Sequence, residues 1–259
     1  MKHYAVITFL FNKYDLLREP VVVDEEADYY CLTDDLTLKS DVWNIIYIDK
    51  FDTDKFTGVQ KTYMAKYSFY KYLPEVYDYY VTIDAAIEIV GKLSPVIEMF
   101  DKHDYNIGLS IHPARDNWLT EYSCWTGSRG LDRKYVKMFE DYATQNGFNP
   151  KGKNGLIECT VKIYKNTPDV IGFINNVYTT LGLVNNFEDK NDQCYFTCVL
   201  GLHLNRLSPV FFTRNFYACS KYMVSYFHGT NTRVTTGKAV DINYNPRRLF
   251  GNIVNLIDL

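Results

Sequence analysis

The sequence predicts an α/β fold in which a mainly parallel central sheet is flanked by helices. Tyr4–Leu10 and Tyr79–Ile83 are continuous apolar runs rich in β-branched and aromatic residues, as in strands buried on both faces. Segments with helical periodicity separate the strand candidates of the first half, which favours parallel crossovers. With 259 residues, 47% of them hydrophobic and 23% charged, the chain fits one globular domain over residues 1–259.

The first half contains most of the predicted strands. They are Tyr4–Leu10, Asp28–Leu32, Trp43–Ile48, Tyr79–Ile83, a short Ile87–Val90, and Ile107–Ile111. A helix is predicted over about Thr57–Leu73, because aromatic and apolar residues recur there every three or four positions and Pro74 stops it. Leu93–Phe100 is a second helix, opened by Ser94 and Pro95.

The second half is more mixed. Leu131–Asn146 carries one apolar stripe and ends before Gly147, so it is predicted to be a helix. The other elements expected here are the loop Asn149–Asn154, the strand Leu156–Tyr164, and the helices Asp169–Leu181 and Asp192–Leu202. The segment 231–259 reads as a polar C-terminal tail.

Charge and composition exclude some classes of protein. The formal net charge of −3 argues against nucleic acid as a partner, because phosphate backbones need a basic surface. The 23 Tyr and 16 Phe residues suit a cleft that packs against sugar rings, although any single aromatic residue is more often core. No feature of the sequence indicates an oligomeric state.

The location of the protein is predicted from what the sequence lacks. Met1–Leu10 runs directly into a strand with no signal peptide, and no apolar run is long enough for a transmembrane segment. The six cysteines are scattered and are interpreted as reduced, buried thiols. We therefore expect a cytoplasmic, soluble enzyme of bacterial or viral type, or a truncated chain.

Residues that follow the predicted strands are the first candidates for a site, because parallel α/β sheets bind ligands beyond the carboxyl ends of their strands. They are Phe11, Asn12, Thr33, Asp34, Asp84 and His112. Asp84 is the sharpest, since the two alanines after it leave room for a ligand. A turn or helix-cap aspartate is an equally good interpretation from the pattern alone. Neither a dinucleotide fingerprint, a P-loop nor a nucleophile elbow is present.

Other polar residues stand out within apolar surroundings, each with a plainer alternative. Lys66 lies in an aromatic stripe, where it either snorkels to solvent, the favoured interpretation, or points into a cleft. Arg115 either binds an anion or pairs with a nearby carboxylate. Asp192 and Gln193 begin an apolar helix, where an aspartate is usually a cap. His228 either ligates a metal or diphosphate or is structural.

Taken together, these segments resemble glycosyltransferases of the GT-A type. The stretch 80–100, YVTIDAAIEIVGKLSPVIEMF, is similar to the DxD segment of glycogenin-type enzymes. A closer similarity is to a formerly uncharacterised glycosyltransferase-like domain family with plant cell-wall members. It rests on FNKYDLLREP (11–20), DYYCLTDD (28–35), YDYYVTIDA (77–85), HPARDNWLTE (112–121), GLIECTVKIYKN (155–166) and NDQ (191–193).

The resemblance covers about residues 4–205 and implies a GT-A-like single domain. It implies a nucleotide-binding half over about residues 1–110, and an acceptor and catalytic half over about residues 111–230. The implied binding residues for donor or acceptor are Thr8, Phe9, Phe11, Asn12, Thr33, Asp34, Lys66, Asp84, Ala86, His112 and Arg115. The implied catalytic residues are Asp192 and Gln193, with Glu158 as an alternative acceptor ligand or base, and the implied metal ligands are Asp84 and His228.

One position departs from the pattern of the resemblance. The third residue of the DxD motif is Ala86, which removes a usual carboxylate ligand of Mn²⁺ or Mg²⁺, and Glu88 is the nearest substitute. The resulting expectation is a glycosyltransferase that moves a sugar from a nucleotide-sugar donor, with UDP or GDP as the nucleotide, to a glycan or other hydroxyl acceptor. The alternatives are a non-catalytic nucleotide-sugar-binding domain and a hydrolase on a related fold.

Overall fold

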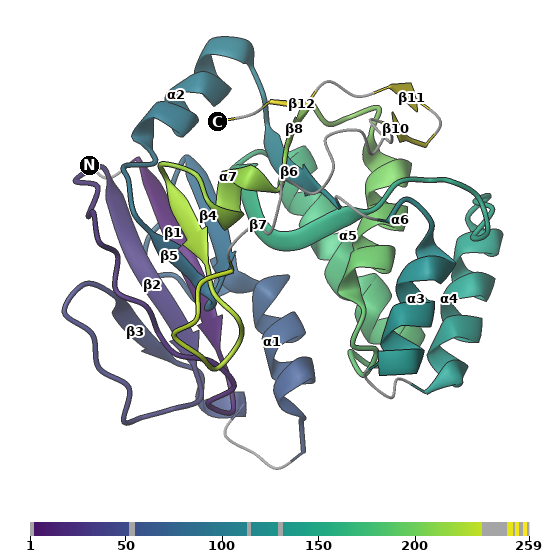
Figure 1. Ribbon diagram of the computed structural model, residues 1–259, viewed down its shortest axis with the longest axis horizontal. Helices are drawn as coiled ribbons and strands as arrows, with labels where there is room; N and C mark the ends of the chain where they lie inside the picture. Colours follow the sequence, from purple (N-terminus) through teal and green to yellow (C-terminus); the bar gives the residue numbers. More distant parts are fainter. Residues whose placement is uncertain are drawn as a thin grey trace.

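The computed structural model describes residues 3–51, 55–112, 115–128, 132–234, 248–250, 252–253, 256–257 and 259. Its centre is a sheet of eight strands in the order β12-β8-β6-β7-β4-β1-β2-β3 (Figure 1). The strands of this sheet are β1 (Tyr4–Leu10), β2 (Ala27–Thr33), β3 (Asn44–Tyr47), β4 (Tyr79–Asp84), β6 (Ile107–Ile111), β7 (Ile157–Lys165), β8 (Pro209–Phe212) and β12 (Leu256–Ile257).

Helices lie on both sides of the sheet. They are α1 (Gly58–Lys66), α2 (Ser94–His103), α3 (Trp118–Ser128), α4 (Arg133–Gln145), α5 (Pro168–Asn185), α6 (Asp192–His203) and the short α7 (Asn215–Ala218). In Figure 1, α3 to α6 gather beyond β7, away from the edge formed by β2 and β3. An α/β fold with a mainly parallel sheet flanked by helices is confirmed.

One strand of the sheet, β7, runs opposite to the other seven. Five neighbouring pairs are parallel, whereas β7 runs antiparallel to both β4 and β6. The amino end of β7 therefore lies at the same edge as the carboxyl ends of β4 and β6. This edge carries most of the residues discussed below.

The predicted central strand is the best example of sequence dictating burial. All seven residues of β1 are buried, because β2 and β4 cover both of its sides and an apolar layer covers each face. Ile7 packs in the layer under α1, α5 and α6, and Val6 packs in the layer under α2 and α7. A run without polar alternation is what such a position requires.

The helix predicted over Thr57–Leu73 is shorter than expected. Thr57 and Gln60 form a reciprocal capping box at its start. It ends at Lys66, because Ser68 leaves the helical conformation (φ −139°) and its hydroxyl donates back to the Met64 carbonyl. A 3₁₀ turn over Phe69–Lys71 follows and buries Phe69. Lys66 consequently stands at the last turn of α1.

Two predictions for other segments also change. The strand expected over Ile87–Val90 is β5 (Ile87–Ile89), which leaves the main sheet and pairs with β9 (Met223–Ser225). The C-terminal tail is not without structure where it is described. Its residues form β12 at the edge of the main sheet and a small pair, β10 (Arg248–Leu249) with β11 (Asn252–Ile253).

Two further expectations concern cysteines and membranes. Cys31, Cys159, Cys194 and Cys198 are buried, but Cys124 and Cys219 are exposed, so the prediction of buried thiols is wrong for those two. In the part of the chain that the structure describes, no helix has the length and apolar character needed to cross a membrane.

Candidate functional site

Three of the predicted site residues meet at the carboxyl end of β4. The ammonium of Lys66 lies 3.0 Å from Asp84 Oδ1 and 3.6 Å from Asp192 Oδ2. The Lys66 side chain is 6% exposed and that of Asp192 is 8% exposed, whereas that of Asp84 is 28% exposed. Lys66 therefore does not snorkel to solvent. It neutralises two carboxylates, one of which opens toward solvent.

Asp192 is the first residue of α6 but not its cap. The cap is Asn191, whose side-chain oxygen accepts a hydrogen bond from the amide of Cys194. This leaves the Asp192 carboxylate to accept a 2.6 Å hydrogen bond from the hydroxyl of Tyr67 and to contact Lys66. Gln193 follows it on the helix, and its Oε1 is buried with no hydrogen-bond partner among the described residues.

The charges of this group depend on one another. Burial alone would lower the pKa of Lys66, but the negative charges of Asp84 and Asp192 outweigh it and hold the pKa well above its usual range. The lysine thus stays protonated at every physiological pH. A protonated ammonium fixed between two carboxylates leaves the three charges with a net value of −1 when both acids are ionised.

A second lysine lies next to this group and was missed by the sequence analysis. Lys162, in β7, is fully buried, and its Nζ donates a 2.6 Å hydrogen bond to the carbonyl of Cys159. Burial and the charge of Lys66 lower the pKa of Lys162 to about 8. The only signal in the sequence is a lysine inside the strand run TVKIYK, which is equally typical of an edge strand.

The predicted nucleotide side is organised by another buried lysine. Lys61 Nζ lies 2.7 Å from Asp34 Oδ2 and donates a 3.1 Å hydrogen bond to Asn12 Oδ1. The amide of Asn12 donates to Asp34 Oδ1 at 2.9 Å, and Asn12 adopts a left-handed conformation (φ 53°) that asparagine tolerates well. The turn after β1 is therefore bonded to the residue that follows β2. Lys61 has no counterpart in the sequence predictions.

The remaining residues predicted for the nucleotide side are largely enclosed by protein. Thr8, Phe9, Phe11 and Thr33 are all buried, and Phe11 packs in the core. The hydroxyl of Thr33 accepts a hydrogen bond from the amide of Asp35. The hydroxyl of Thr8, in contrast, is buried without a hydrogen-bond partner among the described residues. Their contact with a nucleotide stays a prediction.

The residues around Ala86 are held by the β5–β9 pair. Ala86 is buried, and its carbonyl accepts a hydrogen bond from the amide of Tyr226. Glu88, the nearest carboxylate after Ala86, accepts a 2.8 Å hydrogen bond from the Tyr226 hydroxyl at Oε2. His228 lies two residues beyond Tyr226, and its Nδ1 is 2.6 Å from Asp15 Oδ2.

These donors fit a divalent cation only in part. No cluster of three or more histidine, cysteine or acidic side chains arranged to bind a metal occurs among the residues that the structure describes. Asp84 nevertheless presents a partly exposed carboxylate at the sheet edge, and Mg²⁺ commonly binds to one or two carboxylates together with the phosphates of a substrate. Asp84 is therefore the residue that would hold such a cation, together with the phosphates of a bound ligand.

A second polar group lies at the same edge, around Glu158. Glu158 is buried near the amino end of β7, pairs in register with Ser110 of β6, and has its pKa raised by burial. His112 follows β6, and burial together with the charges of Arg115 and Arg214 lowers its pKa to about 3. His112 Nδ1 accepts a 3.1 Å hydrogen bond from the amide of Arg115.

The structure decides only in part between the two interpretations of Arg115, which were anion binding and pairing with a nearby carboxylate. Its guanidinium forms an ion pair with the buried carboxylate of Glu121, on α3. The charge of Arg115 also helps to lower the pKa of His112 and opposes the rise that burial causes in the pKa of Glu158. Arg115 therefore lies beside the site and is already paired with the carboxylate of Glu121.

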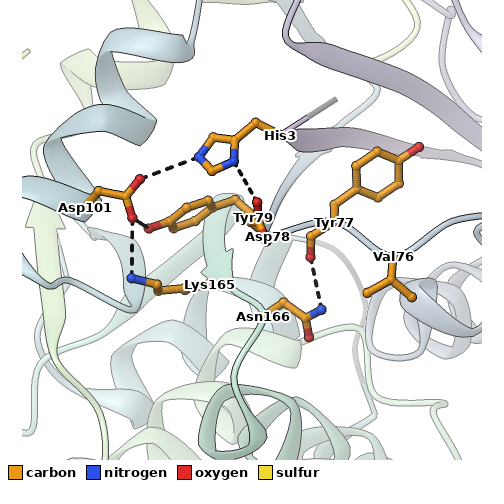
Figure 2. A pocket seen from close by; sticks show the side chains of 8 residues that line it. All are labelled: His3, Val76, Tyr77, Asp78, Tyr79, Asp101, Lys165 and Asn166. Carbon is orange, nitrogen blue, oxygen red and sulfur yellow. Dashed lines mark hydrogen bonds and ion pairs between the residues drawn. The ribbon is translucent and has the colours of Figure 1, made fainter. Parts of the chain in front are cut away.

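A cavity of about 350 Å³ lies elsewhere, at the opposite end of the strands from Asp84. Figure 2 shows His3 between Asp78 and Asp101, with Lys165 also directed at Asp101. These residues precede β1 and β4, lie on α2, or end β7, so the cavity is at the amino end of the parallel strands. It is therefore remote from Asp84 and Asp192.

Comparison with known proteins gives little beyond the arrangement itself. No family model matches the sequence, and no curated protein matches it. The chain is similar to the crystal structure of core-mannan synthase A from Aspergillus fumigatus in its Mn/GDP form, with 11% identity and a TM-score of 0.47. The similarity covers 82% of this chain and 73% of that one. At these values it carries no argument about activity.

Proposed function

We propose that the chain is a glycosyltransferase that moves a sugar from a nucleotide-sugar donor to a hydroxyl acceptor. The observation that carries the proposal is the Lys66 ammonium bridging Asp84 and Asp192 at the carboxyl edge of the sheet. Ligands of parallel α/β sheets bind at this edge. All three are among the site residues that the sequence resemblance to GT-A enzymes implies, although they are far apart in the chain.

The geometry suits the charge changes of glycosyl transfer. In this reaction a nucleoside diphosphate leaves with increasing negative charge while the anomeric carbon becomes electron-poor, so the protein must present a cation and a carboxylate together. Lys66 supplies the fixed cation beside the leaving diphosphate, and Asp192 supplies the carboxylate nearest the anomeric carbon. A divalent cation, when bound, neutralises further diphosphate charge, and Asp84 is the residue that would hold it.

The finer assignments extend this proposal. Asn12 and Asp34 orient the nucleotide, held in place by Lys61, and UDP is our first choice of nucleotide, with GDP as the second. Arg115 and His112 face the transferred sugar or the acceptor. His228 acts as a further ligand of the diphosphate or its cation, and Asp15 fixes its ring through Nδ1.

A non-catalytic nucleotide-sugar-binding domain is the second candidate. It is favoured by Ala86, which occupies the position of a usual metal ligand, and by the use of Glu88 to bond Tyr226. Such a domain would bind a nucleotide sugar and leave it intact.

The test is a thermal-shift screen of UDP- and GDP-sugars with and without Mn²⁺, followed by mass spectrometry for sugar transfer or donor hydrolysis. A selective ligand raises the apparent stability. We expect Asp84→Asn and Asp192→Asn to abolish turnover. The matched control is Asp104→Asn, because Asp104 is 99% exposed at the end of α2. Turnover near that of the control in either variant would remove that residue from the mechanism, and binding without turnover in the unmodified protein would favour the second candidate.

A further inference from the structure

Four polar atoms beside the proposed reaction centre are buried without a hydrogen-bond partner among the described residues. They are Glu158 Oε2, Arg214 Nε, Tyr217 Oη and Ser110 Oγ. A buried polar group without a partner costs free energy, and native proteins seldom leave several of them in one place. Their concentration at one edge of the sheet is therefore informative.

The fold brings these residues together from four elements. Ser110 of β6 lies opposite Glu158 of β7 on one side and opposite Phe212 of β8 on the other. A bulge between Leu109 and Ser110 shifts the register at this point. Arg214 follows β8 and precedes α7, which carries Tyr217. All of them lie at the edge where β4 ends in Asp84.

The charges of these side chains act on one another. The Arg214 charge and the Tyr217 hydroxyl both favour the ionised form of Glu158, and burial opposes it. Glu158 and, more weakly, Asp84 raise the pKa of Tyr217. The Tyr217 hydroxyl faces Glu158 without reaching regular hydrogen-bond geometry at Oε2. The group is thus continuous with the site around Asp84.

The donor and acceptor types indicate the ligand. A carboxylate oxygen accepts, a guanidinium N–H donates, and the two hydroxyls do either. An anion such as phosphate would meet the Glu158 charge, and a cation would meet the Arg214 charge. Neighbouring hydroxyl groups of a neutral sugar suit both, since one hydroxyl donates to the carboxylate while the next accepts from the guanidinium.

We propose that Glu158, Arg214, Tyr217 and Ser110 form a subsite that binds adjacent hydroxyl groups of a sugar ring. This inference rests on the proposed function and names the substrate chemistry of one part of that site. The sugar is either the transferred unit of the donor or the acceptor, which share this chemistry. Glu158 and Tyr217 contact the ligand directly, and Arg214 both contacts it and favours the ionised form of Glu158 against the effect of burial.

The experiment measures two affinities in parallel by calorimetry and saturation-transfer NMR. The first is the affinity of the protein for UDP and GDP, which is compared with its affinity for UDP-glucose and GDP-mannose. The second is that of a set of neutral methyl glycosides, measured with the nucleoside diphosphate present. The variants Glu158→Gln and Tyr217→Phe preserve side-chain shape, and Glu98→Gln, on an exposed position of α2, is the matched control.

We expect both variants to weaken sugar binding about tenfold or more while affinity for the nucleoside diphosphate is unchanged. Loss of the affinity difference between nucleotide sugar and nucleotide assigns the subsite to the donor sugar, and loss of glycoside binding assigns it to the acceptor. Unchanged sugar binding in both variants overturns the proposal. Nucleotide binding with no sugar recognition in the unmodified protein overturns the subsite alone. Absence of binding by every probe overturns the proposed function as well.

Discussion

Replacing Lys66 with methionine tests whether the bridging ammonium holds the site together. The substitution keeps most of the apolar stem and removes the charge between Asp84 and Asp192. Two carboxylates would then share a largely enclosed space without a counter-ion. We expect Lys66→Met to fold less stably and to lose donor binding.

The magnitude follows from burial and distance. Removing one partner of a buried ion pair costs about 3–5 kcal/mol. Because Asp84 is 28% exposed and can be solvated in part, the lower limit of about 3 kcal/mol applies. For a chain of this size, that loss corresponds to a decrease in melting temperature of about 6–12 °C. Adding Asp192→Asn removes an uncompensated charge and should restore part of the loss, at least about 1 kcal/mol.

The assay is urea unfolding followed by circular dichroism, with Lys137→Met as the control. Lys137 forms an exposed ion pair with Asp141 on α4, and its replacement should leave the unfolding midpoint unchanged. The raised pKa of Lys66 means that its stabilisation is complete below the unfolded pKa of about 10.4 and disappears as the pH rises beyond it. The difference between wild type and Lys66→Met should therefore be constant from pH 7 to 9. An effect as small as that of Lys137→Met, or no recovery in the double variant, refutes the reasoning.

Three further outcomes are expected, two from buried groups and one from the partly exposed Asp84. Burial raises the pKa of Asp189 to about 7 despite hydrogen bonds from Tyr122 and Asn191. The free energy of unfolding of the wild type should therefore fall relative to that of Asp189→Asn as the pH rises from 4 to 7. Equal pH profiles of the two proteins would contradict this. The lowered pKa of Lys162 destabilises the fold below about pH 8. Urea unfolding should therefore show Lys162→Met to be more stable than the wild type at pH 7, and by a smaller margin at pH 9.5. A margin that stays the same at both pH values would rule out the lysine charge as the cause. In calorimetry, Mn²⁺ should bind measurably only when a nucleoside diphosphate is present, and it should bind more weakly to Asp84→Asn than to the wild type. Tight binding of Mn²⁺ alone would contradict this, because it would indicate a preformed site on the protein.

The sequence predicted the strands well because burial on both faces leaves a direct trace in composition. The run Tyr4–Leu10 has no polar alternation, and β1 is buried along its whole length. The end of the helix before Pro74 was harder to predict. The residues after Lys66 continue an aromatic stripe, yet the side chain of Ser68 competes for a backbone carbonyl and the chain turns.

The candidate site was predictable only where a residue follows a strand. Asp84 was selected on that ground, and the helical stripe that contains Lys66 left two orientations open. The favoured one was wrong, because the direction of a side chain depends on what lies opposite it, here Asp192, which is distant in the sequence. Lys162 and Tyr217 carried no usable signal, since a charged residue inside a strand and a tyrosine in a short helix have many ordinary explanations.

The single reversed strand, β7, has a consequence for how the protein folds. Its pairing with β4 joins segments separated by more than 70 residues, and it is this pairing that carries Glu158 to the edge occupied by Asp84. Contacts of such high sequence separation form late and slowly, because the entropy cost of closing a long loop must be met before the contacts add any stability. A polypeptide that ends before residue 165 could pair β1 with β2 and β4, but the carboxyl edge would remain incomplete until the strand from the second half is inserted.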